Sequence, residues 1–275
     1  MLENLFGVSK PVIGVIHLLP LPGSPNFEGQ LEIVCLRAEQ EAAALSTGGV
    51  NAIIVENFFD APFTKGRVDV ATACALALVA QRVAAVVDIP VGVNVLRNDG
   101  LTALAVAATI SASFIRVNVY TGAMLTDQGI IEGQAYELQT YRRRLGVSER
   151  VKIFADVMVK HADPLSPYTN ITQVAKDTVG RGRADAVIVS GAATGSAPDI
   201  TDLKAVRSAV PDAPLLVGSG ATPENIGLLL SVADGVIAAS SLKRQGVLEN
   251  PVDVERTRQL VEAAKAASKQ PGRTC

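Results

Sequence analysis

The chain has 275 residues, of which 48% are hydrophobic, and a formal net charge of −2 at pH 7. This length is sufficient for one large hydrophobic core, and α/β barrels of this size commonly form a single domain. The near-neutral charge provides no basic surface for nucleic acid, because the one basic run, Arg142–Arg144, is typical of a solvated helix face. We therefore expect no nucleic-acid partner.

Signals for export and for membrane insertion are missing from the sequence pattern. The chain opens MLENLFGVSKP, without the charged-then-apolar pattern of a signal peptide. The two most apolar stretches contain Arg82 and Arg116, so neither is typical of a transmembrane helix. The three cysteines are widely spaced and form no CxxC motif, which favours reduced, buried thiols over a disulfide framework. We expect a protein made and kept in a reducing compartment, the cytoplasm.

Short β-branched segments alternate with helical patterns along the whole chain. The predicted strands are residues 12–18, 51–57, 91–96, 114–118, 151–157, 186–191, 214–220 and 235–241. Alternating strands and helices predict parallel pairing with helical crossovers, and eight such units predict a (β/α)₈ TIM barrel. We expect one barrel domain over residues 1–267 and a flexible tail over 268–275. A doubly wound sheet is the alternative, but no GxGxxG motif follows the first strand.

The predicted loops differ in length according to their direction. Links from strand to helix are long, as in residues 18–30 and 119–133, whereas links from helix to strand are short, as in residues 87–90 and 210–213. The long loops therefore gather at the carboxyl ends of the strands, where barrel enzymes build their sites.

Polar side chains occur at the carboxyl ends of six predicted strands. Strand side chains alternate between the barrel interior and the helices, and the helices require apolar cover. The side chains that this alternation directs inward are His17, Glu56, Asn94, Arg116, Asn118, Asp156 and Ser190. Buried charges need partners, so Arg116 either pairs with Glu56 or Asp156 in a purely structural network or helps to hold a ligand. Their common position at the functional end favours a binding pocket.

This pocket contains groups suited to acid–base chemistry. Asp156, Lys160 and His161 lie close together in sequence after the fifth strand, and close charges shift pKa values. The candidate catalytic residues are Asp156, His161, Lys160, Glu56 and His17, and the candidate ligand-binding residues are Asn94, Arg116, Asn118, Ser190 and Gly191. A divalent cation on His17, Glu56 and Asp156 is an alternative, but ligands from three strands have no diagnostic spacing. The sequence indicates no organic cofactor and we assign no metal ligands, so the divalent cation stays the less favoured alternative.

Small residues follow the seventh and eighth strands. Gly218, Ser219 and Gly220 precede Thr222-Pro223, a predicted helix start, and Ser240-Ser241 ends the last strand. In TIM barrels these two loops frequently form a phosphate site from backbone N–H groups. The alternative is that small residues simply let the loops pass closely. We predict a phosphorylated ligand whose phosphate binds at Gly218, Ser219, Gly220, Ser240 and Ser241.

Long motifs in a fixed order resemble the BtpA family, and specifically its cyanobacterial photosystem I biogenesis branch. The motifs are GVIHLLPLPGSP (14–25), IIVENFFDAPFTK (53–65), VGVNVLRNDG (91–100), FIRVN (114–118), DQGIIEGQA (127–135), ADVMVKHA (155–162), VIVSGAATG (187–195) and VGSGATPENI (217–226). The resemblance implies a TIM barrel needed for the accumulation or stability of photosystem I reaction-centre proteins, with those proteins or their assembly machinery as partners. It also implies peripheral attachment to the cytoplasmic face of thylakoid membranes, but it implies no mechanism.

Two functions from different classes remain open at this point. One is an assembly or stability factor without essential turnover. The other is an enzyme acting on a small sugar-phosphate or nucleotide-like substrate, with Asp156 or His161 as base and Arg116 or Lys160 balancing anionic charge. We expect Phe58-Phe59 to close over the pocket rather than to dock on lipid, so that membrane contact runs through protein partners. We also expect a homo-oligomer, because barrel proteins often self-associate.

Overall fold

The structure, a computed structural model, describes residues 1–166, 169–191 and 193–269. Parallel strands form a closed barrel in the order β1-β11-β10-β9-β7-β4-β3-β2. Their bounds are β1 Val12–His17, β2 Ala52–Glu56, β3 Val91–Asn94, β4 Phe114–Val117, β7 Lys152–Asp156, β9 Ala186–Val189, β10 Leu215–Val217 and β11 Gly235–Ala238. The predicted (β/α)₈ barrel is confirmed.

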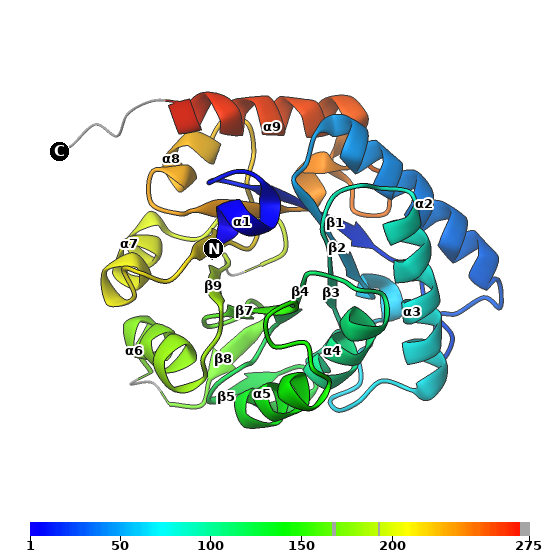
Figure 1. Ribbon diagram of the computed structural model, residues 1–275, viewed down its shortest axis with the longest axis horizontal. Helices are drawn as coiled ribbons and strands as arrows, with labels where there is room; N and C mark the ends of the chain where they lie inside the picture. Colours follow the sequence, from blue (N-terminus) through cyan, green and yellow to red (C-terminus); the bar gives the residue numbers. More distant parts are fainter. Residues whose placement is uncertain (167–168, 192, 270–275) are drawn as a thin grey trace.

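Helices follow the barrel strands and form a ring around them (Figure 1). Their bounds are α2 Leu31–Gly48, α3 Val70–Ala85, α4 Gly100–Thr109, α5 Ala135–Arg144, α6 Ile171–Lys176, α7 Ile200–Ala209, α8 Ile226–Leu230 and α9 Val254–Lys269, with short turns η1 Phe58–Asp60, η2 Asp177–Arg181, η3 Ser240–Leu242 and η4 Arg244–Gly246. Side-chain oxygens of Asp69, Asp99 and Asp199 cap α3, α4 and α7. Asp is favoured at this position because its carboxylate accepts a hydrogen bond from a backbone N–H group that has no partner within the helix.

Three details differ from the sequence-based expectations. Arg142 of α5 is buried and pairs with Asp185, so the predicted solvated face of this helix holds only Arg143 and Arg144 of the basic run. Cys35 is buried as expected, but Cys74 is exposed, because it lies on the outer face of α3. Helix α9 extends through Ser268 to Lys269, and residues 270–275 of the expected tail lie outside the described residues.

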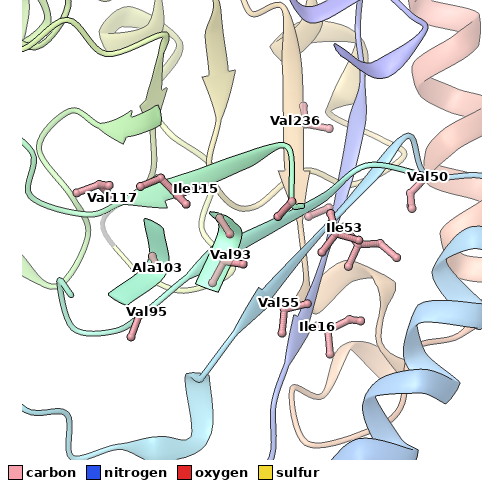
Figure 2. Packing of buried hydrophobic residues seen from close by; sticks show 14 of the residues in the cluster. Ile16, Val50, Ile53, Val55, Val93, Val95, Ala103, Ile115, Val117 and Val236 are labelled. Atoms are coloured by element: carbon pink, nitrogen blue, oxygen red, sulfur yellow. The ribbon is translucent and has the colours of Figure 1, made fainter. Parts of the chain in front are cut away.

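Alternation along the strands separates an outer from an inner apolar layer. Ile53 and Val55 of β2, Val93 of β3, and Ile115 and Val117 of β4 belong to the outer cluster that packs against the helices (Figure 2). In β2 and β4, apolar residues of opposite parity, Ala52, Ile54 and Phe114, belong to a second cluster inside the barrel. The register predicted from this alternation is therefore correct, and it turns the polar ends of the strands inward.

A short N-terminal helix, α1 Leu2–Phe6, closes the inner cluster and lies over the centre of the ring in Figure 1. The Phe6 ring packs edge-on against Phe114 and Phe154 at centroid distances of 5.6 and 6.2 Å, and these two rings stack on each other at 4.8 Å. Gly92 makes room for them, because a Cβ atom there would lie 2.3 Å from the Phe114 ring. The sequence pattern did not predict this helix, because five residues carry too little periodicity.

Two of the long loops contain strands that the sequence did not reveal. β5 Ala123–Thr126, β6 Gly129–Glu132 and β8 Ala162–Pro164 form an antiparallel sheet in the order β6-β5-β8. This sheet joins the loop after β4 to the loop after β7, because β5 pairs with β8, as in Met124 with Pro164 and Thr126 with Ala162. Strands of three and four residues that pair between two distant loops have no local signal, and the adjacent β5–β6 hairpin is equally short.

We expect Phe6→Ala to lower the free energy of unfolding by about 3 kcal/mol, because it removes a buried ring from the barrel interior. Glu3→Ala in the same helix changes an exposed side chain and serves as the control, with an effect within about 0.5 kcal/mol. Urea denaturation of both variants measures the difference. Equal midpoints for the two variants would show that α1 does not contribute to the core.

Candidate functional site

A buried ion pair between two strands forms the floor of the site. Arg116 of β4 donates from Nε to Asp156 Oδ2 at 2.8 Å and from Nη2 to Asp156 Oδ1 at 2.9 Å, and Asp156 lies on the neighbouring strand β7. Side-chain exposure is 4% for Arg116 and 0% for Asp156. Burial acts to lower the pKa of Arg116, but the Asp156 charge and hydrogen bonds outweigh it and the pKa is raised. Arg116 is therefore permanently charged and fixed in orientation.

Asp156 is surrounded by hydrogen-bond donors. Ser190 Oγ donates to its Oδ1 at 3.2 Å, and Asn118 Nδ2 donates to its Oδ2 at 3.4 Å, in addition to the two bonds from Arg116. Each carboxylate oxygen thus accepts two hydrogen bonds. Because both oxygens are occupied by protein donors, Asp156 is poorly placed to take a proton from a ligand. These contacts of Asp156 agree with the purely structural ion-pair network that the sequence left open.

Glu56 occupies a different environment at the end of β2. Its Oε2 accepts a hydrogen bond from Asn94 Nδ2 at 2.5 Å, and its Oε1 lies 3.6 Å from His17 Nε2. Burial, with the positive charges of Lys243, Lys160 and Arg116, holds the pKa of His17 well below its usual value. The imidazole is therefore neutral at physiological pH. Its Nδ1 has no hydrogen-bond partner among the described residues.

Two phenylalanines of η1 cover the histidine. The Phe58 ring stacks on His17 at a centroid distance of 4.0 Å and an interplanar angle of 14°, and Phe59 meets His17 edge-on at 6.3 Å. Both rings also line a cavity at this face. Phe58-Phe59 therefore forms a wall of the pocket, as the sequence led us to expect.

A cavity of about 470 Å³ opens above the floor, within the size range of small-molecule sites. Its apolar wall consists of Phe58, Phe59, Ala61, Phe63 and Leu96. Its polar lining consists of Asn26, Glu56, Arg97, Arg116, Asn118, Asp127, Lys160, His161 and Thr194. The cavity thus joins residues from the loops after β1, β2, β3, β4, β7 and β9.

Buried side chains tie these loops to one another. Asp60 Oδ1 accepts a hydrogen bond from the Leu21 backbone N–H at 2.7 Å, and Asn57 Oδ1 accepts one from that of Leu96 at 2.7 Å. Asn98 bonds both backbone groups of Val119, at 2.8 and 2.9 Å. The loops after β1 to β4 are therefore cross-linked in sequence around the rim, which preorganises the pocket.

The loop after β7 brings two of the predicted residues to the cavity. Burial lowers the pKa of Lys160, and the neighbouring Arg116 charge acts in the same direction. His161 is exposed, and its Nε2 lies 3.1 Å from Thr194 Oγ1. Arg97, which sequence reasoning missed, donates from Nη2 to the Lys160 carbonyl at 2.8 Å. Its place directly after a barrel strand was the available signal.

The predicted phosphate-binding glycines pack tightly against the loop after β9. Gly220 has φ of 72°, and a Cβ atom there would lie 2.1 Å from the Ala197 backbone nitrogen. A Cβ atom on Gly191 would lie 2.4 Å from the Ser196 carbonyl oxygen, and Ser219 Oγ donates to the same oxygen at 2.8 Å. The close approach of neighbouring loops therefore explains why residues 191 and 220 are glycines, as in the alternative interpretation of the sequence.

The hollow beside these glycines is small. Gly218, Ser219, Gly220 and Ser240 line a space of about 20 Å³, enough for one water molecule. Ser241 does not line it, and its carbonyl accepts a hydrogen bond from Arg256. The loop that carries both serines is anchored by a buried pair, Lys243 Nζ to Glu41 Oε2 at 2.7 Å. Phosphate binding at these loops stays a prediction that requires them to move apart.

The residues weighed as cation ligands are not brought together. His17 and Glu56 approach each other, but Asp156 is turned to Arg116. Within residues 1–166, 169–191 and 193–269, no cluster of three His, Cys, Asp or Glu side chains suits a metal ion.

We expect Asp156→Leu to lower the free energy of unfolding by about 3–5 kcal/mol, because it leaves the Arg116 charge buried without its partner. Adding Arg116→Met removes that charge, so the double variant recovers most of the loss. Urea denaturation of the single and double variants measures this coupling. A double variant as unstable as the sum of both single variants would contradict it.

We expect the protein to lose stability as the pH falls from about 7 to about 5.5, by at most about 1.4 kcal/mol per pH unit from His17. The unfolded chain binds a proton on this residue near pH 6.5, whereas the folded chain does not because the pKa is lowered. The contribution is thus fully present above pH 6.5 and is lost below it. Thermal unfolding across this range should show a smaller loss for His17→Gln.

His161→Gln is the control for this prediction. Burial also lowers the pKa of His161, but this side chain is exposed, so its variant should keep nearly the full pH dependence of the unmodified chain. Equal pH dependence in the unmodified chain and in His17→Gln would show that His17 titrates freely in the folded state.

Comparison with known proteins places this architecture in a family. The model of the BtpA family matches residues 8–266. The chain is 52% identical to the photosystem I biogenesis protein BtpA of Synechocystis sp., over 99% of this chain and 94% of that protein. It is also 46% identical to an uncharacterized protein of Thermococcus kodakarensis, over 93% of this chain and 95% of that one.

Similarity to solved structures concerns the fold alone. Thiamine phosphate pyrophosphorylase from Pyrococcus furiosus superposes with a TM-score of 0.57 at 14% identity, covering 97% of this chain and 99% of that one. The barrel therefore has the architecture of known enzymes, whereas its sequence is related to the BtpA family. Because the family model matches nearly the whole of this chain, residues 8–266, the chain belongs to the BtpA family.

Proposed function

We propose that this protein acts in the biogenesis or stability of photosystem I. The observation that carries the proposal is the 52% identity, over 99% of the chain, with the photosystem I biogenesis protein of Synechocystis. Identity this high along the full length supports a shared role. The proposed partners are photosystem I reaction-centre proteins or the machinery that assembles them.

We place this activity at the cytoplasmic face of the thylakoid membrane, with the protein attached peripherally. In the described part of the chain, no helix has the length and apolar character needed to cross a membrane. Phe58 and Phe59 pack on His17 and line the cavity, which argues against lipid docking through these rings. Attachment through protein partners accounts better for the association. Self-association of the barrel stays a prediction.

The pocket is the part of the molecule through which we expect this role to be controlled. A cavity of about 470 Å³ with Glu56, Arg116, Asn118 and Lys160 in its lining is suited to a small polar ligand. The proposed ligand is a phosphorylated small molecule. Candidate binding residues beyond the cavity are Asn94, Ser190 and Gly191, and the loops at Gly218–Gly220 and Ser240-Ser241 complete the predicted set. In this role the ligand stabilises one state of the barrel without turnover.

Catalysis on the same ligand class is the second candidate function. It is favoured by Glu56 and Lys160, an acid–base pair of residues in one cavity with the pKa of Lys160 lowered by burial. Glu56 suits the role of base better than Asp156, whose two oxygens each accept two hydrogen bonds. His161 lines the cavity and neutral His17 lies 3.6 Å from Glu56, so both are placed to assist proton transfer, and Arg116 balances anionic charge.

Deleting the gene for this chain should lower the level of photosystem I reaction-centre proteins, and re-expression should restore it. We expect Glu56→Gln to restore it as well, because the change keeps shape and removes only a proton acceptor. Asp127→Asn, which removes a negative charge at the exposed rim of the same cavity, is the control. Immunoblots of reaction-centre proteins measure the outcome.

Two results would change this conclusion. Unchanged photosystem I levels in the deletion strain would remove the proposed function itself. A Glu56→Gln chain that folds and accumulates but fails to restore photosystem I, while Asp127→Asn succeeds, would favour the catalytic candidate.

A further inference from the structure

Arg97 is an exception among the buried cations of this protein. The described residues contain four buried cationic side chains, Arg97, Arg116, Arg142 and Lys243. Arg116, Arg142 and Lys243 each pair with a carboxylate, on Asp156, Asp185 and Glu41. Within the described part of the chain, the guanidinium of Arg97 donates a hydrogen bond only to the Lys160 carbonyl. A buried charge without a counterion costs several kcal/mol, so the remaining donors of Arg97 call for a partner.

Lys160, which is half-buried, is a second cation that forms no ion pair with a carboxylate among the described residues. It lines the same cavity, and no group among the described residues accepts a hydrogen bond from its Nζ. Burial lowers the pKa of Lys160 and of Arg97, as expected for cations whose nearby carboxylates do not compensate for lost water. Two positive charges with open donors therefore face one space.

The two carboxylates of the cavity lining, Glu56 and Asp127, contact residues other than Arg97 and Lys160. Glu56 accepts the hydrogen bond of Asn94 and faces His17. Asp127 lies exposed at the turn between β5 and β6 and accepts a hydrogen bond from Gln128. Neither forms an ion pair with Arg97 or Lys160 in the described part of the chain. No carboxylate of the described residues therefore serves as the counterion of these two cations, and an anionic ligand in the cavity is suited to that role.

The backbone around Lys160 is held in an unusual conformation. Met158 and His161, on either side of it, have φ of 54° and 56°, in the left-handed region that side-chain-bearing residues rarely adopt. Each such residue costs on the order of 1 kcal/mol and persists only where surrounding contacts enforce it. The hydrogen bond from Arg97 to the Lys160 carbonyl is one such contact. Arg97 thus holds the second cation in position.

Asn118 adds an acceptor to the same space. Its Nδ2 donates to Asp156, which can only accept, so the orientation of the amide is fixed. Its Oδ1 is buried, has no partner among the described residues, and belongs to a side chain that lines the cavity. An acceptor of this kind suits a hydroxyl group of a ligand.

We propose that Arg97 and Lys160 form an oxyanion subsite for a phosphate monoester of a hydroxylated small molecule, with Asn118 Oδ1 accepting a hydrogen bond from a ligand hydroxyl. A phosphate monoester carries up to two negative charges at neutral pH, which match the two cations. Arg97 supplies a planar set of donors and Lys160 a point charge. The inference rests on the proposed ligand-binding role of the pocket, and it moves the phosphate away from the loops at Gly220 and Ser240.

Isothermal titration of the purified full-length chain with inorganic phosphate and with glycerol 3-phosphate tests this assignment. We expect both probes to bind and glycerol 3-phosphate to bind more tightly. Lys160→Met should weaken both at least tenfold, because it keeps the stem and removes the charge, whereas Lys160→Arg should retain binding. Asn118→Ala should remove the advantage of glycerol 3-phosphate over phosphate.

Lys152→Met is the matched control. Lys152 is also half-buried, lies at the opposite end of β7, and gives the same change in net charge, so phosphate affinity should be unaltered. Circular dichroism checks the fold of each variant, and the retained binding of Lys160→Arg separates charge from shape.

Three results would overturn the assignment. They are no binding of either probe to the unmodified chain, unchanged affinity in Lys160→Met, and a tenfold loss in Ser240→Ala with none in Lys160→Met. The last would place the anion at the loops after β10 and β11. These measurements do not depend on photosystem I levels, so failure here and failure of the proposed function are distinguishable.

Discussion

The bidentate pair between Arg116 and Asp156 is the interaction on which the functional end of the barrel depends. It joins adjacent strands across the interior, at the point where the apolar filling of the barrel ends. Both charges are buried, so each requires the other, and Asn118 and Ser190 donate the remaining hydrogen bonds to the carboxylate. The pair thereby covers the apolar interior of the barrel and forms a rigid, charged floor of the cavity.

Above this floor, rigidity comes from side chains that bond to the backbone of neighbouring loops. Asn57, Asp60 and Asn98 each satisfy backbone groups in another loop, so the rim is held by polar contacts where no regular secondary structure is available. The sheet of β5, β6 and β8 does the same for the loops after β4 and β7. A pocket built in this way is preorganised for one ligand shape, which suits regulation by a ligand as well as catalysis.

The positions of the polar residues along the strands do not show which of them pair with each other and which face the cavity. Alternation along the strands correctly directed Glu56, Arg116 and Asp156 inward, because period 2 is a local property of a strand. Which carboxylate pairs with Arg116 depends on strand order, since β4 and β7 are neighbours in the barrel while β2 lies farther round. That pairing commits Asp156 and leaves Glu56 to face the cavity. Arg97 has no such local signal, because its hydrogen bond to the Lys160 carbonyl joins residues 63 positions apart.

The sequence by itself determined the barrel, its single set of functional loops, the inward polar residues and the resemblance to the BtpA family. Strand and helix periodicity, loop lengths and ordered motifs are all written along the chain, so these features need no knowledge of distant contacts. Tertiary structure alone decided the packing of α1 on the inner cluster, the pairing of β5 with β8, the partner of Arg116 and, among the described residues, the lack of a carboxylate partner for Arg97 and Lys160. Each of these depends on contacts between segments far apart in sequence, and such contacts arise only when the barrel closes.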